Sequence, residues 1–300
     1  MKKLFYLMLV VLGTAAFTAC SDDDDNNGDG NGNDEPIQTP VYHYGEITMI
    51  SDDSNLSSAI YTFNVGDTIT IDYGDGYVQQ AVANESYEEY DNEGNVIAKR
   101  GNIHLDYTYS DREEHTITIK GNISGLYCIY EQLTSLDVSK CTALTYLDCG
   151  NNELTSLDIT KNTALTYLDC RNNELTSLDV TKNTALTYLN CSSHQLTSLD
   201  VTKNTALTYL DCRDNQLTSL DITKNTALTS LDCAENQLTS LDVTKNTALT
   251  YLSCKYNQFT AAEMNKIYEA LPTVEDKTLW CDRLGNPSIA EQKGWEVIFD

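Results

Sequence analysis

Basic residues are absent from a long stretch of this chain: from Ser21 to Ala98 there are 18 Asp and Glu residues and no Lys or Arg. The 300-residue chain has a formal net charge of −26. That balance argues against nucleic acid as a partner, because binding a phosphate backbone depends on basic side chains that release counterions. Catalytic signatures are also lacking, since the chain has four His residues, no zinc-binding helix motif, no nucleophile elbow and no phosphate-binding loop. We therefore expect no enzymatic activity, no cofactor and no metal.

The apolar stretch at the start of the chain is too short to span a membrane. Residues 1–20, MKKLFYLMLVVLGTAAFTAC, combine a basic start, a 14-residue apolar stretch and an end of small residues, which is the pattern of a secretory signal. The last residues, Phe17 to Cys20, resemble the lipobox of bacterial lipoproteins, and this resemblance implies acylation of Cys20. The acidic run from Ser21 to Asp25 is similar to the export tag of lipoproteins displayed on the outer surface of Gram-negative bacteria. We therefore expect an outer-membrane protein, exposed on the cell surface, that contacts the membrane only through the lipid on Cys20.

Two segments of different composition follow the signal. Residues 21–40 have almost no apolar side chains, which predicts an acidic, disordered tether. Residues 41–122 contain short alternating runs of β-branched and aromatic residues bounded by Gly, Asp and Asn, which indicate a small antiparallel β-sandwich. Asp72–Gly76, together with Tyr107–Ser110 leading to Thr116–Ile119, resembles the PKD-type β-sandwich module. That resemblance implies a spacer or recognition domain without chemistry of its own.

A 21-residue unit recurs through residues 123–260. Its first half matches the leucine-rich pattern L-x-x-L-x-L-x-x-N-x-L, with Cys in place of the third Leu. The pattern resembles the short-repeat leucine-rich family of bacterial surface proteins, and the resemblance implies a solenoid of stacked coils. One coil cannot bury its leucines alone, so we expect its stability to come from its neighbours. Complete units begin at Leu144, Leu165, Leu186, Leu207 and Leu228.

One cysteine recurs in every unit. Strand alternation points it inward, beside a leucine, in a column with a spacing of roughly 4.8 Å. Disulfides between coils and a zinc site are the alternatives. Parallel strands in register aim their Cβ atoms the same way, which opposes the roughly 90° torsion of a disulfide, and a straight line of thiols is not a tetrahedron. We expect core thiols. The column consists of Cys128, Cys149, Cys170, Cys191, Cys212, Cys233 and Cys254.

Two columns of asparagine are expected to satisfy backbone groups at the two turns of each coil, because an amide side chain both donates and accepts. Asn152 begins the first column and Asn162 begins the second. His194 and Glu131 interrupt the first column, and Cys141 interrupts the second. Each interruption is expected to weaken its turn.

The outward side of the strand column is the predicted ligand-binding face. Tyrosine supplies contact area at low entropic cost, and Arg is another common interface residue. The predicted face consists of Tyr146, Asp148, Tyr167, Asp169, Arg171, Tyr188, Asn190, Tyr209, Asp211, Arg213, Asp232 and Tyr251.

These features favour a non-catalytic binding protein whose partner is a protein or a glycan. The alternative is a structural or assembly component of the cell envelope, with the solenoid as a spacer and the regular face a product of duplication alone. A hydrolase is disfavoured, because acids stacked on an open face lack the enclosed pocket that raises a carboxyl pKa.

Residues 261–300 lack the period and are expected to cap the open end of the solenoid. Thr260 with Glu263, and Ser288 with Glu291, predict capping boxes at the starts of two helices. The fold class expected for the whole chain is mainly β: a leucine-rich-repeat solenoid with an N-terminal β-sandwich and a small α+β C-terminal cap.

Overall fold

A computed structural model describes residues 44–90, 96–111, 113–273 and 277–299, with the backbone alone at residues 87, 89, 90 and 96–99. The predicted signal, Cys20 and the acidic tether lie outside these residues. Within them, none of the helices has the length and apolar character needed to cross a membrane.

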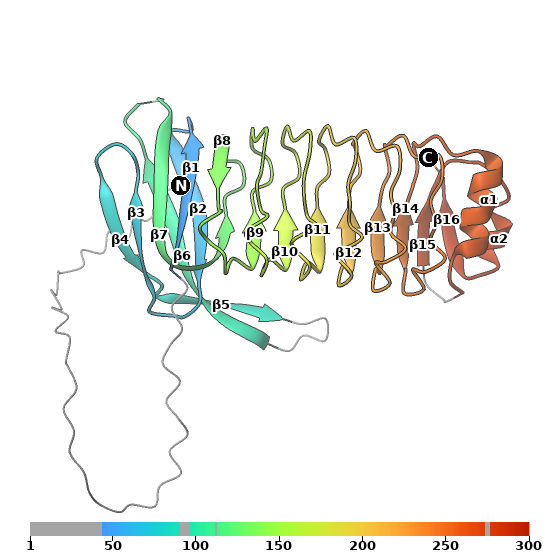
Figure 1. The fold of residues 1–300 in the computed structure, drawn as a ribbon, viewed down its shortest axis with the longest axis horizontal. Helices are drawn as coiled ribbons and strands as arrows, with labels where there is room; N and C mark the ends of the chain where they lie inside the picture. Colours follow the sequence, from blue (N-terminus) through green and yellow to red (C-terminus); the bar gives the residue numbers. More distant parts are fainter. Residues whose placement is uncertain (1–43, 91–95, 112, 274–276, 300) are drawn as a thin grey trace, which may run out of the picture. The chain divides into compact units, whose positions relative to one another are not determined.

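The first part of the fold is a β-sandwich. Its two sheets have the strand orders β8-β1-β7-β3-β4 and β5-β6-β2-β7, so that β7 belongs to both (Figure 1). Alternate residues of the strands point into a shared core, where Ile47, Ile60, Ile71 and Ile119 are fully buried. The strands are β1 (Tyr44–Ser51), β2 (Asn55–Thr62), β3 (Thr68–Asp72), β4 (Val78–Val82), β5 (Glu85–Tyr90), β6 (Val96–Thr108), β7 (His115–Tyr127) and β8 (Leu133–Asp137).

Strand β7 joins the sandwich to the repeats. Its first half pairs with β1 and β3, and its last residues pair with β2 on one side and with the first strand of the solenoid on the other. Gly121 lies where the strand passes from one sheet to the other, with φ of 155°. A Cβ atom there would lie 2.8 Å from Ile69 Cγ2, so this crossing requires glycine.

The repeats form a solenoid in which every complete coil contributes one three-residue strand. Successive strands are parallel and in register, so each Tyr, Leu or Asp lies beside its counterpart in the next coil. One sheet therefore runs from the sandwich through the solenoid into the cap (Figure 1). The solenoid strands are β9 (Tyr146–Asp148), β10 (Tyr167–Asp169), β11 (Tyr188–Asn190), β12 (Tyr209–Asp211), β13 (Ser230–Asp232) and β14 (Tyr251–Ser253).

The interior of the solenoid is made of leucine, isoleucine, valine and cysteine. In one coil Leu147, Cys149, Leu154 and Ile159 all have 0% exposure. All nine cysteines in the described part are free and buried, which confirms that the thiols pack in the core. Some thiols also contact the next coil, as where Cys170 Sγ lies 3.5 Å from the carbonyl oxygen of Asn190.

The two asparagine columns differ in what they bond. Asn152 Oδ1 accepts from the amides of Glu131 and Leu133, and its Nδ2 donates to the carbonyl oxygens of Cys128 and Cys149, as predicted. The second column only donates. Its Oδ1 atoms are buried without a hydrogen-bond partner, so the expectation of equal roles is wrong. The residues concerned are Asn162, Asn183, Asn204, Asn225 and Asn246.

The last part of the fold caps the solenoid. It comprises α1 (Ala261–Ala270), β15 (Lys277–Trp280), α2 (Ser288–Glu291) and β16 (Trp295–Ile298), and both strands extend the parallel sheet. Thr260 caps α1 by accepting from the amide of Glu263, as predicted. The prediction of a second capping box is wrong. The N-cap residue of α2 is Pro287, and no side chain makes a capping hydrogen bond there. The predicted fold class is confirmed.

Candidate functional site

A row of tyrosine rings runs along the strand face. The rings of Tyr146 and Tyr167 have centroids 4.5 Å apart, and the next two steps, to Tyr188 and Tyr209, are 4.3 and 4.4 Å. In-register strands place equal side chains at this spacing, so the rings stack at angles of 12° or less and are half-buried. Ser230 interrupts the row before Tyr251.

The row continues onto the sandwich. Gly125 of β7 is the register partner of both Tyr61 of β2 and Tyr146 of β9. Because glycine has no side chain, the Tyr61 ring reaches over β7 and meets Tyr146 edge-on, with centroids 5.4 Å apart. The tyrosine row, defined as Tyr61, Tyr146, Tyr167, Tyr188 and Tyr209, therefore crosses from one domain to the other.

The carboxylates beside the row are not exposed, which corrects the prediction for this part of the face. These short side chains are buried, and in each of them Oδ1 accepts from the backbone amide two positions on. Asp169 Oδ1, for example, accepts from the amide of Arg171 at 3.1 Å. The residue exposures are 5% for Asp148, 1% for Asp169, 3% for Asn190, 2% for Asp211 and 9% for Asp232.

Burial changes the acidity of this row. It raises the pKa of Asp148 and of Asp211 to about 6, and it also raises the pKa of Asp169. The expectation that acids on this face keep an ordinary pKa is therefore wrong. These carboxylates still do not form a catalytic pair facing a cavity, because they serve as acceptors for the turn of their own coil.

The two predicted arginines pair with the buried acids. Arg171 Nη1 lies 3.2 Å from Asp169 Oδ2, and Arg213 lies 3.5 Å from Asp211 and 3.7 Å from Asp232. The arginine side chains remain 38% and 50% exposed, so they cover the acids and present their guanidinium groups outward. Among the described residues, no group of three or more His, Cys, Asp or Glu is arranged to hold a metal ion.

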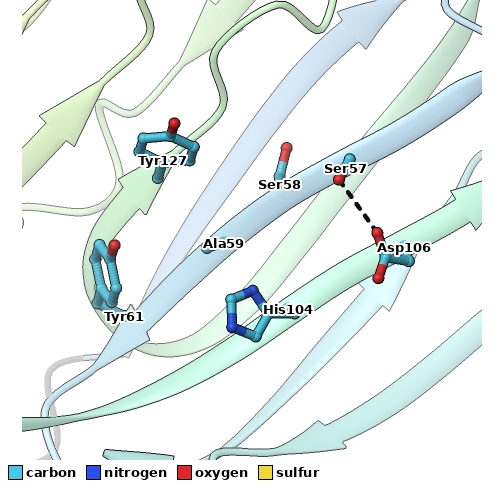
Figure 2. Close-up of a pocket in the computed structure, with 7 residues that line it drawn as sticks. All are labelled: Ser57, Ser58, Ala59, Tyr61, His104, Asp106 and Tyr127. Carbon is cyan, nitrogen blue, oxygen red and sulfur yellow. Dashed lines mark hydrogen bonds between the residues drawn. The ribbon is translucent and has the colours of Figure 1, made fainter. Parts of the chain in front are cut away.

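A cavity of about 250 Å³ lies on the sandwich beside the end of the tyrosine row (Figure 2). Its walls come from three neighbouring strands, which register brings together: Ala59 faces His104 on β6 and Tyr127 on β7. Sequence reasoning missed this site, because no motif signals it and it depends on the pairing of β2 with both β6 and β7. The cavity is lined by Ser57, Ser58, Ala59, Tyr61, His104, Asp106 and Tyr127.

Glu131 lies behind this cavity. It interrupts the first asparagine column, and instead of bonding the turn its carboxylate accepts from the Ser57 amide at 3.1 Å. Burial raises its pKa to about 7. Glu131, at a position where other coils have asparagine, thus connects the first coil to the sandwich.

Comparison with known proteins identifies the repeat type. The family described as Leucine Rich repeats (2 copies) matches residues 205–246. No curated protein matches the chain. Among solved structures, the functional domain of InlJ from Listeria monocytogenes, described as including a cysteine ladder, is 38% identical, with a TM-score of 0.50. That match covers 63% of this chain and 42% of the InlJ chain.

Two further solved structures are less similar to this chain. An internalin C2 from Listeria monocytogenes is 23% identical over 46% of this chain and 64% of its own, with a TM-score of 0.44. A leucine-rich-repeat protein of Leptospira interrogans is 22% identical over 57% and 47%, with a TM-score of 0.48. The repeats are therefore leucine-rich repeats, and the family match indicates no catalytic family. This chain spans less than half the length of the InlJ chain it matches.

Proposed function

We propose that this chain is a non-catalytic binding protein that recognises a protein partner through the tyrosine row and its neighbouring arginines. The observation that carries the proposal is the stacked row itself. Four rings are held parallel by backbone register, and each is half-buried, so little conformational freedom remains to be lost on binding. Tyrosine and arginine are also the residues that dominate interface energetics.

The buried acids have a different role from the one predicted. They accept from backbone amides and anchor Arg171 and Arg213, so they position the contact residues instead of touching the partner. The binding face proposed here accordingly comprises the tyrosine row, Tyr251 and the two arginines. Asp148, Asp169, Asn190, Asp211 and Asp232 form its support.

The proposal includes an anchored location. Acylation of Cys20 and an acidic tether would hold the sandwich and the solenoid away from the outer membrane on the cell surface. The strand face would then be open to large partners. This part is tested separately by expressing the full chain in a Gram-negative host with a labelled fatty acid. The parent chain should carry the label, and the Cys20→Ala variant should not.

The binding function is tested by replacing two central rings. Ser230 already occupies a position of the row, so Tyr167→Ser with Tyr188→Ser introduces a side chain that the coil accepts. The variant and the parent chain are applied to an array of extracellular proteins and glycans, and thermal unfolding of both is recorded. We expect protein ligands of the parent to be lost by the variant, which still unfolds cooperatively above the assay temperature. Unchanged binding by the double variant contradicts the proposal. If the parent chain binds only glycans on the array, the partner is a glycan and the proposed protein partner is wrong.

A chain that binds nothing on either array but co-purifies with envelope proteins would support the spacer alternative instead. Thr176→Ala with Thr197→Ala, on exposed loop positions away from the strands, is the matched control for surface change.

A further inference from the structure

The cavity on the sandwich lies on the same face as the tyrosine row. Tyr61 belongs to both, because its ring packs on Tyr146 and also lines the cavity. Tyr127, on the same side of the cavity as Tyr61, is the register partner of Asp148 in the first solenoid strand. A partner that lies along the tyrosines therefore reaches the cavity without changing direction.

The walls of the cavity carry negative charge and aromatic faces. Asp106 is exposed at its rim and accepts from Ser57 Oγ at 3.1 Å, which fixes its orientation (Figure 2). Tyr61 and Tyr127 stand on the other side (Figure 2). His104 also lines the cavity; its side chain is exposed and its Nε2 lies 3.7 Å from Glu85 Oε2.

Further acidic groups lie behind these walls. The buried carboxylate of Glu131 accepts from the Ser57 amide at 3.1 Å. Burial, and after it the carboxylate of Asp148, raises the pKa of the Tyr127 phenol, while Arg171 acts in the opposite direction. Asp106 supplies the main negative charge at the cavity, because burial favours the neutral forms of Glu131 and Asp148.

Compensating basic groups do not line the cavity. Among the residues that form its walls there is no Lys or Arg. Arg171, two residues after the end of β10, pairs with Asp169 at 3.2 Å. A carboxylate with two aromatic rings, and with no Lys or Arg among the residues that line the cavity, is a combination that attracts a guanidinium or an ammonium group.

We propose that this cavity receives a basic side chain, Arg or Lys, of the protein that binds the tyrosine row. The inference rests on the proposed function for the identity of the partner as a protein. Its volume of about 250 Å³ is below the roughly 300–1,000 Å³ of pockets that enclose drug-sized ligands, which suits one inserted side chain. The cation would lie between the ring faces of Tyr61 and Tyr127, with Asp106 as its counter-ion.

The test uses a small probe in place of the partner. Nα-acetyl-arginine methylamide is titrated into the full chain carrying ¹³C-labelled tyrosine rings, and the ring resonances of Tyr61 and Tyr127 are followed by NMR. These resonances are assigned with Tyr61→Phe and Tyr127→Phe. The matched neutral probe is Nα-acetyl-citrulline methylamide, which has the same shape without the charge. We expect saturable shifts of both rings with the arginine probe, and binding about five- to tenfold weaker for citrulline.

Asp106→Asn removes the charge while keeping an acceptor for Ser57, and it should weaken the arginine probe by a similar factor. Asp242→Asn, an exposed acid of the solenoid, should leave the probe affinity unchanged. No shift with arginine, equal shifts with citrulline, or shifts with a methyl glycoside but not with arginine would each overturn the proposal. Because the probe does not depend on the tyrosine row of the solenoid, Tyr167→Ser with Tyr188→Ser should still bind it even if the proposed function fails.

Discussion

Tyr61 of the sandwich and Tyr146 of the first complete coil meet edge-on across Gly125, with ring centroids 5.4 Å apart and planes at 86°. The two residues are 85 positions apart in the chain, yet they form one step of a continuous aromatic row. This contact joins the two domains on the very face proposed to bind. The sandwich is therefore part of the proposed recognition surface as well as a cap on the first coil.

Gly125→Ala should loosen this junction. The new Cβ would lie 2.7 Å from Tyr61 Cδ2 and 3.1 Å from Tyr146 Cβ, so both side chains must move. We expect a loss of about 1–3 kcal/mol in the free energy of unfolding, measured in urea. Gly150→Ala is the control, because its nearest contact is the flexible Arg171 side chain and Ala234 already stands at the equivalent position. Equal losses for the two variants would contradict the role assigned to Gly125.

His194→Asn should stabilise the solenoid. The imidazole is 8% exposed, its Nε2 has no partner, and its Nδ1 lies 2.9 Å from the carbonyl oxygen of Asn173. Asparagine at this position in other coils makes several backbone hydrogen bonds, so we expect a gain of about 1–2 kcal/mol at pH 8. The measurement is urea unfolding.

The gain from His194→Asn should grow below pH 6.5. Burial lowers the pKa of His194 from the ordinary value of 6.5, so the unfolded chain binds the proton more readily and the parent loses stability as the pH falls through 6.5. His104→Asn, at an exposed ring, should change the free energy of unfolding little. A pH-independent gain would show that His194 is not buried as a neutral ring.

Asp211→Asn and Asp242→Asn should respond to pH with opposite signs. Burial raises the pKa of Asp211 to about 6, so the folded chain binds this proton more tightly and the parent loses stability as the pH rises from about 4 to 6. Asn removes that loss, and Asn190 shows that a coil accepts it. Relative to the parent, the Asp211 variant should gain stability across this window.

At Asp242 the hydroxyl and the amide of Thr244 lower the carboxyl pKa below 3.8, so charge at this position is favourable in the folded chain. Asp242→Asn should therefore lose stability relative to the parent as the pH rises through about 4. Chemical unfolding of both variants between pH 3 and pH 8 measures the two slopes. Slopes of the same sign would contradict the burial of the acid row.

Glu235→Asn should stabilise one turn by about 0.5–1 kcal/mol, because Glu235 has φ of 55° and asparagine tolerates the left-handed region better. Asn151 and Asn172 already occupy this position in two coils. Glu174→Asn, at an exposed position outside the left-handed region, should have no such effect. Thermal unfolding of the two single variants is a sufficient comparison.

The nine described cysteines should resist a bulky thiol reagent in the folded chain and react after denaturation. All are buried, and burial raises the pKa of the Cys149 thiol well beyond its ordinary value, which keeps it protonated. Mass spectrometry of digested material locates each modified residue. Modification of most of these sites before unfolding would reverse the inward assignment.

The sequence was sufficient to predict what repeats. The period placed Leu147, Cys149 and Asn152 on the inside of a coil, because the same local pattern recurs and each copy must bury the same residues. Alternation also predicted correctly that Tyr146 and Asp148 share a face. It did not predict that Asp148 is covered, since alternation gives the direction of a side chain but not the height of its neighbours.

The other misses have a similar origin. The unpartnered Oδ1 atoms of the second asparagine column depend on how closely the turns of adjacent coils approach. The cavity depends on contacts between distant segments, such as the hydrogen bonds between Ser57 and Glu131, which are 74 positions apart. The PKD-like relationship of the sandwich, the domain boundaries and the lipid on Cys20 remain predictions.

Each coil presents to the next coil the same contact surface that the previous coil presents to it. Gain or loss of one 21-residue unit would therefore leave the sandwich, the cavity and the cap with matching neighbours, while the aromatic row lengthened or shortened by one rung of about 4.8 Å. Such a molecule can change its reach in discrete increments. Variation in unit number offers a route to fitting partners of different span without redesigning either end.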